Sequence, residues 1–148
     1  MPDSTANDVQ HLAEMVGRHM YAQDHASHAL GITLERIAPG FARVSMQVRK
    51  DMLNSHGMLH GGMSFTLADT AFAYACNSYN RNAVATGCDI VYPAAGREGD
   101  ILTAEAVERH IAGRSGVYDV TVTNQNGEVL ALFRGRSRRL QGTVIPST

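Results

Sequence analysis

One acidic residue lies where no other charge accompanies it. Asp69 is the only charged residue between His60 and Arg81, in a stretch of small and apolar side chains that predicts a buried helix. Burying a carboxylate without a cation is costly unless its pKa rises or another segment supplies partners. Asp69 is therefore the leading candidate for chemistry. The alternative is a structural acid that accepts hydrogen bonds from neighbouring backbone.

Two glycines, Gly61 and Gly62, begin the same helix. The first N–H groups of a helix lack internal partners and carry the positive end of its dipole, and glycine lets a ligand oxygen approach them closely. Two free N–H groups directed at a carbonyl oxygen would stabilise the oxyanion that forms when an ester or thioester is attacked. The alternative is that the glycines only cap the helix.

The separation between these groups predicts a subunit interface. Eight residues of helix from Gly61 to Asp69 span about 12 Å. One substrate carbon must lie roughly 3 Å from both an oxyanion donor and a nucleophile or base, which a single chain does not allow. If both groups serve one reaction, we expect an obligate dimer with two equivalent sites built across its twofold axis.

The loop before the helix holds three more polar candidates, Asn54, His56 and His60. The histidines have the H-x-x-x-H spacing that metal sites use on helices, but they lie in a loop without a tetrahedral ligand set. We predict no metal here and expect His60 to fix the loop through ring hydrogen bonds. No serine or cysteine occupies a G-x-S-x-G elbow, which argues against an α/β-hydrolase.

Hydrophobic periodicity predicts the elements that must position these residues. An amphipathic helix is expected over about 7–24, a hairpin turning at Pro39-Gly40 follows, and a long buried helix is expected over about 61–78. Four further strands are expected at about 83–93, 100–111, 115–125 and 128–139, with Asn126-Gly127 as the clearest hairpin turn. The predicted fold is α+β, an antiparallel sheet wrapped around the long helix, with an additional N-terminal helix and sheet edges that invite a second subunit.

Length and composition narrow the class of protein. At 148 residues the chain is expected to hold one domain over 7–140, with a disordered start at 1–6 and a tail at 141–148. A formal net charge of −1 gives no overall field for nucleic acid or an anionic membrane. The segment 61–80 is too polar to span a membrane, and Cys76 and Cys88 form no disulfide framework, so we expect a cytoplasmic protein.

Three stretches resemble a known family: MLNSHGMLHGGMSFTLADTAFAYACNS, AGRSGVYDV and ALFRGRSRRL. Together with the order of elements they resemble the hotdog-fold acyl-CoA thioesterases of the phenylacetate-degradation family, from about residue 28 to 140. The spacing Asn-x6-Gly-x7-Asp, formed by Asn54, Gly61 and Asp69, is specific to thioesterases of this type. The resemblance implies a sheet around a central helix and a dimer of dimers.

The resemblance also implies roles, position by position. Asp69 matches the catalytic carboxylate, acting either as nucleophile or as general base on water. Gly61 of the partner subunit matches the oxyanion donor, and Asn54 matches the residue that orients the thioester carbonyl or the attacking water. Thr86 lies near where related thioesterases keep a hydroxyl for positioning water, and His60 is the remaining catalytic candidate.

Coenzyme A needs cations and N–H groups for its phosphates, for which the turn at Arg114 and the arginine-bearing face of the last strand are candidates. That face, with Arg134, Arg136 and Arg138, is expected to meet either solvent or CoA. Side chains of the central helix are candidates for the acyl pocket, with core packing as the alternative. The expected substrate-binding residues are Gly62, Phe72, Arg114, Ser115, Gly116 and Arg136, and Phe65 and Met63 are further pocket candidates.

The leading hypothesis is therefore an acyl-CoA thioesterase. Its expected substrate is an aryl-acetyl-CoA (phenylacetyl-CoA or a ring-hydroxylated form) or a related medium-sized acyl-CoA. We expect no cofactor, since coenzyme A is part of the substrate, and a homodimer that assembles to a homotetramer. Two alternatives stay open: a hotdog enoyl-CoA hydratase or dehydratase that recruits His60, and a non-catalytic acyl-CoA binder.

Overall fold

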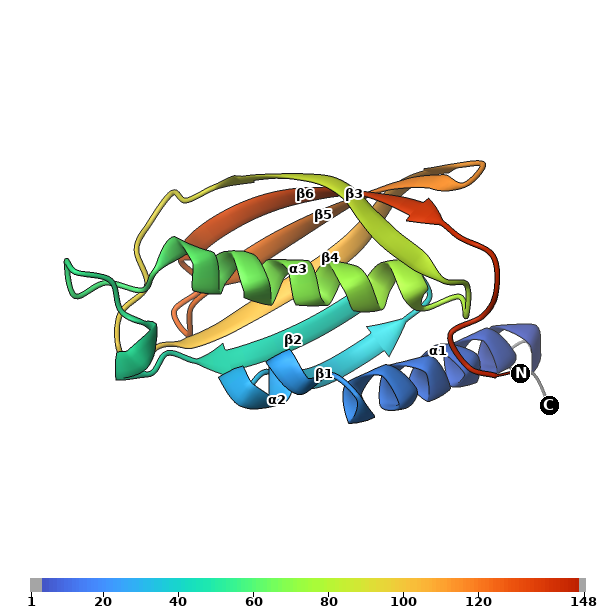
Figure 1. Ribbon diagram of the computed structural model, residues 1–148, viewed down its shortest axis with the longest axis horizontal. Helices are drawn as coiled ribbons and strands as arrows, with labels where there is room; N and C mark the ends of the chain where they lie inside the picture. The colour runs from blue at the N-terminus through green and yellow to red at the C-terminus, as the bar shows by residue number, and fades with distance from the viewer. Residues whose placement is uncertain (1–3, 147–148) are drawn as a thin grey trace.

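The computed structural model describes residues 4–146. Its strands form one six-stranded antiparallel sheet in the order β1-β2-β4-β5-β6-β3 (Figure 1). Along β2 and β5 every second residue is buried, so one face of the sheet is apolar. β1 and β3 are the two edge strands. The strands are β1 Thr33–Ala38, β2 Phe41–Gln47, β3 Ala83–Val91, β4 Ile101–Ala112, β5 Ser115–Thr123 and β6 Val129–Arg139.

The long helix α3, Gly61–Asn77, lies across the apolar face of this sheet (Figure 1). Its small residues Ala68, Ala71 and Ala75 are fully buried, which lets helix and strands approach closely. At Gly135 of β6 an added Cβ would come within 2.8 Å of the Phe72 ring, so only glycine fits beneath it. The sheet curves around α3 and covers one side of it, as the sequence predicts.

Side chains at the end of α3 tie it to the next strand. The Asn77 amide donates to the carbonyls of Ala73 (2.8 Å) and Ala83 (3.1 Å), and its oxygen accepts the N–H of Ala83 (3.0 Å). These bonds end the helix and begin β3 at a fixed place. The orientation of α3 along the sheet is therefore set at this end by local hydrogen bonds.

Two N-terminal helices pack beside the sheet. α1, Ser4–Ala22, buries Ala13, Val16 and Gly17. At Gly17 an added Cβ would lie 2.9 Å from the Ile37 side chain, so α1 packs tightly on β1. The short α2, His25–Leu30, is capped by Asp24, whose carboxylate also accepts the Tyr74 hydroxyl of α3 at 3.0 Å.

The structure differs from the predicted elements in two places. α1 begins at Ser4, so residues 4–6, expected to be disordered, are helical, and residues 1–3 lie outside the described part of the chain. α2 and the 3-10 turn at Lys50–Met52 were not predicted, because elements this short show no periodicity. The sequence pattern leaves the partner of β3 open; the structure pairs β3 with β6, so β3 and β4 are joined by a crossover.

Candidate active site

The helix α3 holds Asp69 near its middle, half-buried. Burial raises the pKa of this carboxyl above its ordinary value of 3.8. Among residues 4–146 no side chain or backbone group forms a hydrogen bond or ion pair with it, and its oxygens keep contact with solvent. A structural acid would be hydrogen-bonded, so the free carboxylate favours the chemical role over the structural alternative.

The start of α3 offers one free N–H group rather than the two that the sequence suggests. His60 is the N-cap, and its Nδ1 accepts the N–H of Gly62 at 2.9 Å. The N–H of Gly61 has no partner within the described chain. Gly62 is thus capped by its own chain, as the alternative held, while Gly61 keeps the donor that an oxyanion needs. The ring of His60 therefore caps α3, and within residues 4–146 it makes no hydrogen bond to the loop that precedes the helix.

Asn54 lies in the compact loop that leads to α3. Its Oδ1 accepts the N–H groups of His56 (2.9 Å) and Met58 (3.2 Å), and Gly57 takes a positive φ of 74° to close the turn. Because Oδ1 is fully used, the Nδ2 group is the free end of the side chain, and it makes no hydrogen bond within residues 4–146. Asn54 therefore offers a donor rather than an acceptor.

Asn54 and Gly61 meet in one cavity of about 390 Å³ at the start of α3. The residues that sequence reasoning missed are the segment 92–96, Met58, Leu59 and Ser64. Tyr92 donates its hydroxyl to the carbonyl of Gly61 at 3.1 Å, so it lies directly against the glycine. No sequence pattern signals this contact, since β3 reaches the cavity only through its crossover pairing with β6. The lining residues are Asn54, Met58, Leu59, Gly61, Ser64, Tyr92, Pro93, Ala94, Ala95 and Gly96.

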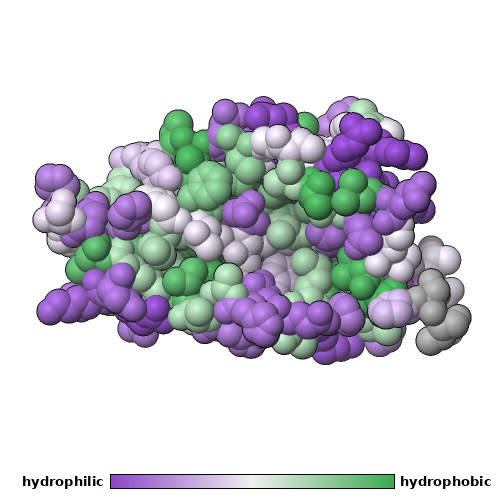
Figure 2. All heavy atoms as spheres, in the orientation of Figure 1, coloured by the Kyte–Doolittle hydropathy of each residue, from purple (hydrophilic) through white to green (hydrophobic). Residues whose placement is uncertain are grey.

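Asp69 does not line this cavity. The helix runs unbroken from Gly61 through Asp69, so the two remain about 12 Å apart along it. The structure thus brings Asn54 and Gly61 together and leaves the carboxylate on the outer side of the same helix. In Figure 2 the face on which α3 lies shows pale and hydrophobic side chains across its middle, with hydrophilic ones along its rims.

The remaining candidates, on the sheet and in α3, make internal contacts. Thr86 is exposed on β3 and donates its hydroxyl to the carbonyl of Arg136 at 3.2 Å. Gly116 is buried, and an added Cβ would come within 2.7 Å of the Ser137 hydroxyl, so this glycine serves strand packing. Phe72 is a core residue whose ring contacts Tyr118 and Phe133, and it does not line the cavity beside Gly61.

Three arginines gather at the opposite end of the molecule. Arg81, Arg114 and Arg139 line a second cavity of about 340 Å³, between the end of α3 and the β4–β5 turn. None of them forms an ion pair with a carboxylate in the described chain. Unpaired guanidinium groups suit phosphate, which they can hold bidentately. Ser115 adjoins this cavity as the first residue of β5.

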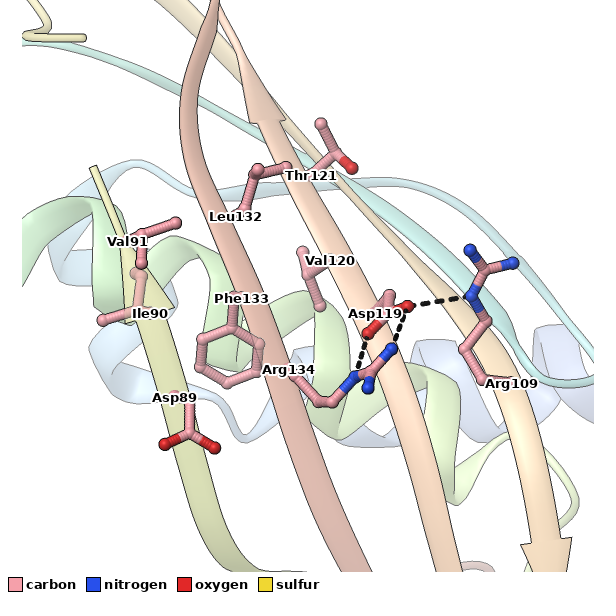
Figure 3. Close-up of a pocket in the computed structure, with 10 residues that line it drawn as sticks. All are labelled: Asp89, Ile90, Val91, Arg109, Asp119, Val120, Thr121, Leu132, Phe133 and Arg134. Atoms are coloured by element: carbon pink, nitrogen blue, oxygen red, sulfur yellow. Dashed lines mark hydrogen bonds and ion pairs between the residues drawn. The ribbon is translucent and has the colours of Figure 1, made fainter. Parts of the chain in front are cut away.

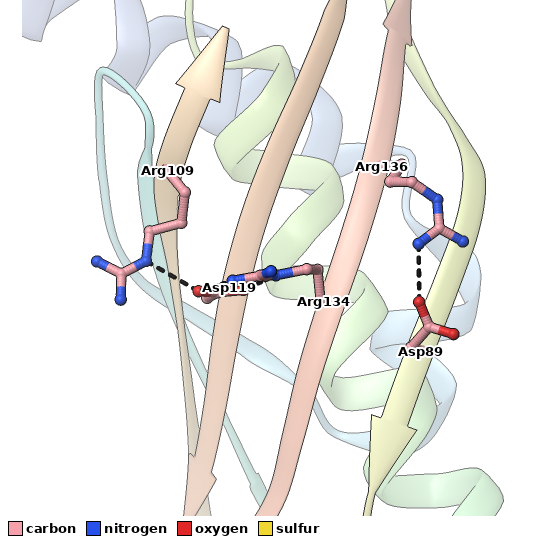
Figure 4. A network of polar contacts seen from close by, with 5 residues as sticks. All are labelled: Asp89, Arg109, Asp119, Arg134 and Arg136. Atoms are coloured by element: carbon pink, nitrogen blue, oxygen red, sulfur yellow. Dashed lines mark hydrogen bonds and ion pairs between the residues drawn. The ribbon is translucent and has the colours of Figure 1, made fainter.

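A third cavity, of about 370 Å³, lies on the outer face of the sheet (Figure 3). Its charges are already paired: Asp119 lies between Arg109 and Arg134, and Arg136 reaches Asp89 at 2.7 Å (Figure 4). Hydrogen bonds from Arg134, aided by Arg109, lower the pKa of Asp119 to about 2. Arg136, expected to bind substrate, is therefore held in an ion pair on this face, away from the cavity of Arg81, Arg114 and Arg139.

The chain is similar to known thioesterases over most of its length. The family model of the thioesterase superfamily matches residues 56–131. Acyl-coenzyme A thioesterase PaaI of Escherichia coli is 47% identical over 136 residues, covering 92% of this chain and 97% of that protein. The structure of the E. coli PaaI protein matches with a TM-score of 0.90 over 91% of this chain and 98% of that chain.

Two further solved structures match less of the chain. A mutant of the phenylacetic acid degradation protein PaaI from Thermus thermophilus gives a TM-score of 0.74 at 40% identity, over 77% of this chain and 97% of that chain. A Streptococcus mutans protein bound to acetyl CoA gives 0.72 at 29% identity, over 76% of this chain and 90% of that chain.

The chain therefore belongs to the thioesterase superfamily and, within it, to the hotdog-fold acyl-CoA thioesterases of the phenylacetate-degradation family that its motifs resemble. The predictions of fold and of enzyme class are confirmed. No helix in residues 4–146 is both long and apolar enough to cross a membrane.

The raised pKa of Asp69 gives a testable pH dependence. Only the ionised carboxylate acts as a nucleophile or base, so kcat/KM is expected to fall about tenfold per pH unit below the pKa of Asp69. Because burial raises that pKa, the acid limb is expected at a pH above 3.8, the ordinary value for aspartate. A rate–pH profile for thiol release measures it, and an acid limb at or below 3.8 would contradict the assignment.

Proposed function

We propose that the protein hydrolyses an aryl-acetyl-CoA, or a related medium-sized acyl-CoA, to the free acid and CoA. The observation that carries this proposal concerns two groups of α3: within residues 4–146, the half-buried carboxylate of Asp69 has no partner, and the N–H of Gly61, the first of the helix, is free. One supplies the negative group that attacks or activates water, and the other supplies the donor for the oxyanion. The solved E. coli PaaI protein comes from the phenylacetic acid degradation operon, and the T. thermophilus relative is a phenylacetic acid degradation protein, which supports a phenylacetate-related acyl group.

In the proposed reaction the thioester carbonyl accepts the N–H of Gly61. Asp69 either attacks the carbonyl carbon itself or removes a proton from the attacking water. The carbonyl oxygen becomes an oxyanion, which the Gly61 N–H stabilises, and the C–S bond then breaks to release CoA thiolate. When Asp69 is the base, the proton that it took from water passes to the thiolate, and the free acid leaves directly. When Asp69 is the nucleophile, an acyl–aspartyl anhydride forms, and water then hydrolyses it to the free acid, restores the carboxylate and supplies the proton for the thiolate. The free Nδ2 of Asn54 donates to the carbonyl or to the water.

The two groups come from different subunits in this proposal. Gly61 and Asp69 of one chain are about 12 Å apart along α3, whereas both must lie roughly 3 Å from the reacting carbon. The side of α3 that carries Asp69 is only half-buried, and β3 is an edge strand with Val84 and Val91 exposed. A second copy placed against α3 and β3 would bury both surfaces, and two such dimers would form the expected tetramer.

The cavity lined by Arg81, Arg114 and Arg139 is the proposed site for the CoA phosphates. Arg114→Ala is expected to raise KM about 3- to 10-fold with kcat unchanged, because the phosphates bind alike in ground and transition states. Arg18→Ala is the control, since Arg18 is exposed on α1 and outside this cavity. Steady-state kinetics measure both, and a fall in kcat at constant KM would contradict the phosphate role.

A panel of aryl-acetyl, benzoyl and straight-chain CoA thioesters tests the proposed function. The expected result is thiol release that is fastest with an aryl-acetyl group. Thiol release from none of them would overturn the proposal and favour a binding protein. Hydration of an enoyl-CoA would favour the dehydratase alternative. That alternative needs His60 for proton transfer, but the Nδ1 atom of His60 already accepts the N–H of Gly62.

A further inference from the structure

Two charged side chains lie on the face of the sheet that α3 covers, in rows whose other members are buried. Glu108 continues the buried row of β4, Arg139 continues that of β6, and both are partly buried. A charge in such a place requires a partner. The preceding members of the two rows are Leu102, Ala104 and Ala106 on β4 and Phe133, Gly135 and Ser137 on β6.

Tyr79, which follows the end of α3, contacts both charges. Its hydroxyl donates to Oε2 of Glu108 at 2.5 Å, and the guanidinium carbon of Arg139 lies 5.4 Å from the centre of its ring. Within residues 4–146 neither Glu108 nor Arg139 forms an ion pair. One aromatic side chain thus satisfies an anion and a cation that do not neutralise each other. Elsewhere in the described chain arginines do form ion pairs with carboxylates: Arg43, Arg49, Arg109, Arg134 and Arg136.

The hydroxyl end of Tyr79 is held where three elements meet. Gly40, in the turn between β1 and β2, donates its N–H to Oγ of Ser78 at 2.8 Å, and its carbonyl accepts the N–H of Glu108 at 2.9 Å. A Cβ at Gly40 would come within 2.6 Å of the Glu108 carboxylate and 2.9 Å of the Tyr79 hydroxyl, so this glycine leaves room for the pair. Burial and the bond to Glu108 raise the pKa of Tyr79 to about 12, so its hydroxyl stays protonated and donates at neutral pH.

The ring end of Tyr79 lies at the cavity proposed for the CoA phosphates. Arg139 lines that cavity with Arg81 and Arg114, and Tyr79 lines an adjoining cavity of about 380 Å³ that shares Arg81 and Gly142 with it. A ring face attracts a guanidinium through its π electrons and takes up none of its N–H groups, whereas a carboxylate occupies them. The guanidinium N–H groups of Arg139 make no hydrogen bond in the described chain, so they are left for a ligand oxygen.

We propose that Tyr79 is a positioning residue that holds the Arg139 guanidinium over its ring, with the N–H groups free to bind a phosphate of the substrate. This inference rests on the proposed function, because it concerns the phosphate cavity assigned there. Without the ring, the guanidinium loses its support, and the Glu108 carboxylate, which also loses its donor, competes with the phosphate for it. Phosphate binding is alike in ground and transition states, so the effect falls on KM rather than on kcat.

The test measures kcat and KM of Tyr79→Leu and Tyr79→Phe with phenylacetyl-CoA and with phenylacetyl-pantetheine, which has no phosphate. For phenylacetyl-CoA, Tyr79→Leu is expected to raise KM about 3- to 5-fold with kcat unchanged, whereas Tyr79→Phe, which keeps the ring, is expected to change KM less than about twofold. For phenylacetyl-pantetheine neither variant is expected to change KM. An unchanged KM for phenylacetyl-CoA in Tyr79→Leu, equal rises with both substrates, or equal rises in both variants would overturn the inference.

Phe41→Leu is the matched control. The Phe41 ring also lies beneath guanidinium groups, those of Arg36 at 5.2 Å and Arg43 at 5.9 Å, but Phe41 lines neither of the two cavities. It is expected to leave KM unchanged for both substrates. If Phe41→Leu raises KM for phenylacetyl-CoA alone as strongly as Tyr79→Leu does, the effect does not depend on the position of Arg139, and the inference fails.

A double variant tests whether Tyr79 acts through Arg139. Arg139→Gln lacks the guanidinium, so adding Tyr79→Leu to it is expected to raise KM for phenylacetyl-CoA less than about twofold further. The full 3- to 5-fold rise, about the same as in the unaltered background, would show an independent action of the ring and overturn the inference.

Two comparisons keep this inference distinguishable from the proposed function. A rise of KM in Arg114→Ala without one in Tyr79→Leu would overturn the inference and leave the phosphate cavity standing, whereas no rise in Arg114→Ala or Arg139→Gln would overturn both. An enzyme that releases no thiol from either substrate would overturn the proposed hydrolysis. In that case calorimetric binding of CoA that is weakened by Tyr79→Leu and kept by Tyr79→Phe would still support the inference, and equal binding by both variants would overturn it.

Discussion

Asp69→Asn is expected to lower kcat for thioester hydrolysis by about 10²- to 10⁴-fold, the range for removing a positioned base. The amide keeps the shape of the side chain but neither attacks a carbonyl nor removes a proton from water. Asp8→Asn is the control, because Asp8 is an exposed carboxylate on α1. Thiol release at an unchanged rate by folded Asp69→Asn protein would contradict the catalytic assignment.

The same substitution is expected to increase the free energy of unfolding at neutral pH. Burial raises the pKa of Asp69 in the folded state above its ordinary value, so the ionised carboxylate destabilises the fold. This destabilisation is fully present above the folded pKa and is lost as the pH falls toward the unfolded value. The gain from Asp69→Asn should therefore appear in urea titrations at pH 7 and vanish below about pH 3.8. A loss of stability at pH 7 would instead identify Asp69 as a structural acid.

Gly61→Pro is expected to lower kcat by about 10²- to 10³-fold, the effect of losing one oxyanion donor. Proline removes the N–H but is favoured at the first position of a helix, so α3 should form as before. His60 has the extended backbone that a following proline requires, with φ −63° and ψ 131°. The loss of activity then arises from the missing donor.

Gly61→Ala is the matched variant, because it adds a Cβ at the same place but keeps the N–H. That Cβ would meet the Tyr92 ring at 3.2 Å, and the Tyr92 side chain, on a residue with 48% exposure, has room to yield. Its loss of activity is expected to stay within about tenfold, well short of the proline variant. Equal losses in the two variants, measured by steady-state kinetics, would show that crowding rather than the N–H group is responsible.

Asp69 and Gly61 were predictable as candidates because their chemistry differs from that of their neighbours in the sequence. Asp69 lacks a charged neighbour along the chain, and Gly61 begins a helix. In the described part of the chain both the carboxylate and the N–H are without partners. The long helix and the strands follow from their periodicity, so the layers of the fold were predictable as well. These features depend on neighbours within a few residues of one another.

The walls of the cavity depend on contacts that no local pattern encodes. Tyr92 reaches Gly61 because β3 pairs with β6 instead of β4, and strand order is a property of the whole sheet. The use of the Gly62 N–H depends on one rotamer of His60. Phe72 was a plausible pocket residue by type, but its ring packs in the core, directly over Gly135 of β6.

The most direct test of the account mixes the two inactive variants, Asp69→Asn and Gly61→Pro, and allows their subunits to exchange. If each site takes Gly61 from one chain and Asp69 from the other, half of the dimers in an equal mixture are mixed, and each of these contains one intact site. The account predicts that thiol release recovers to about a quarter of the activity of the unaltered protein. If both groups act within one chain, no mixed dimer contains an intact site, and absence of recovery despite verified subunit exchange would contradict the account.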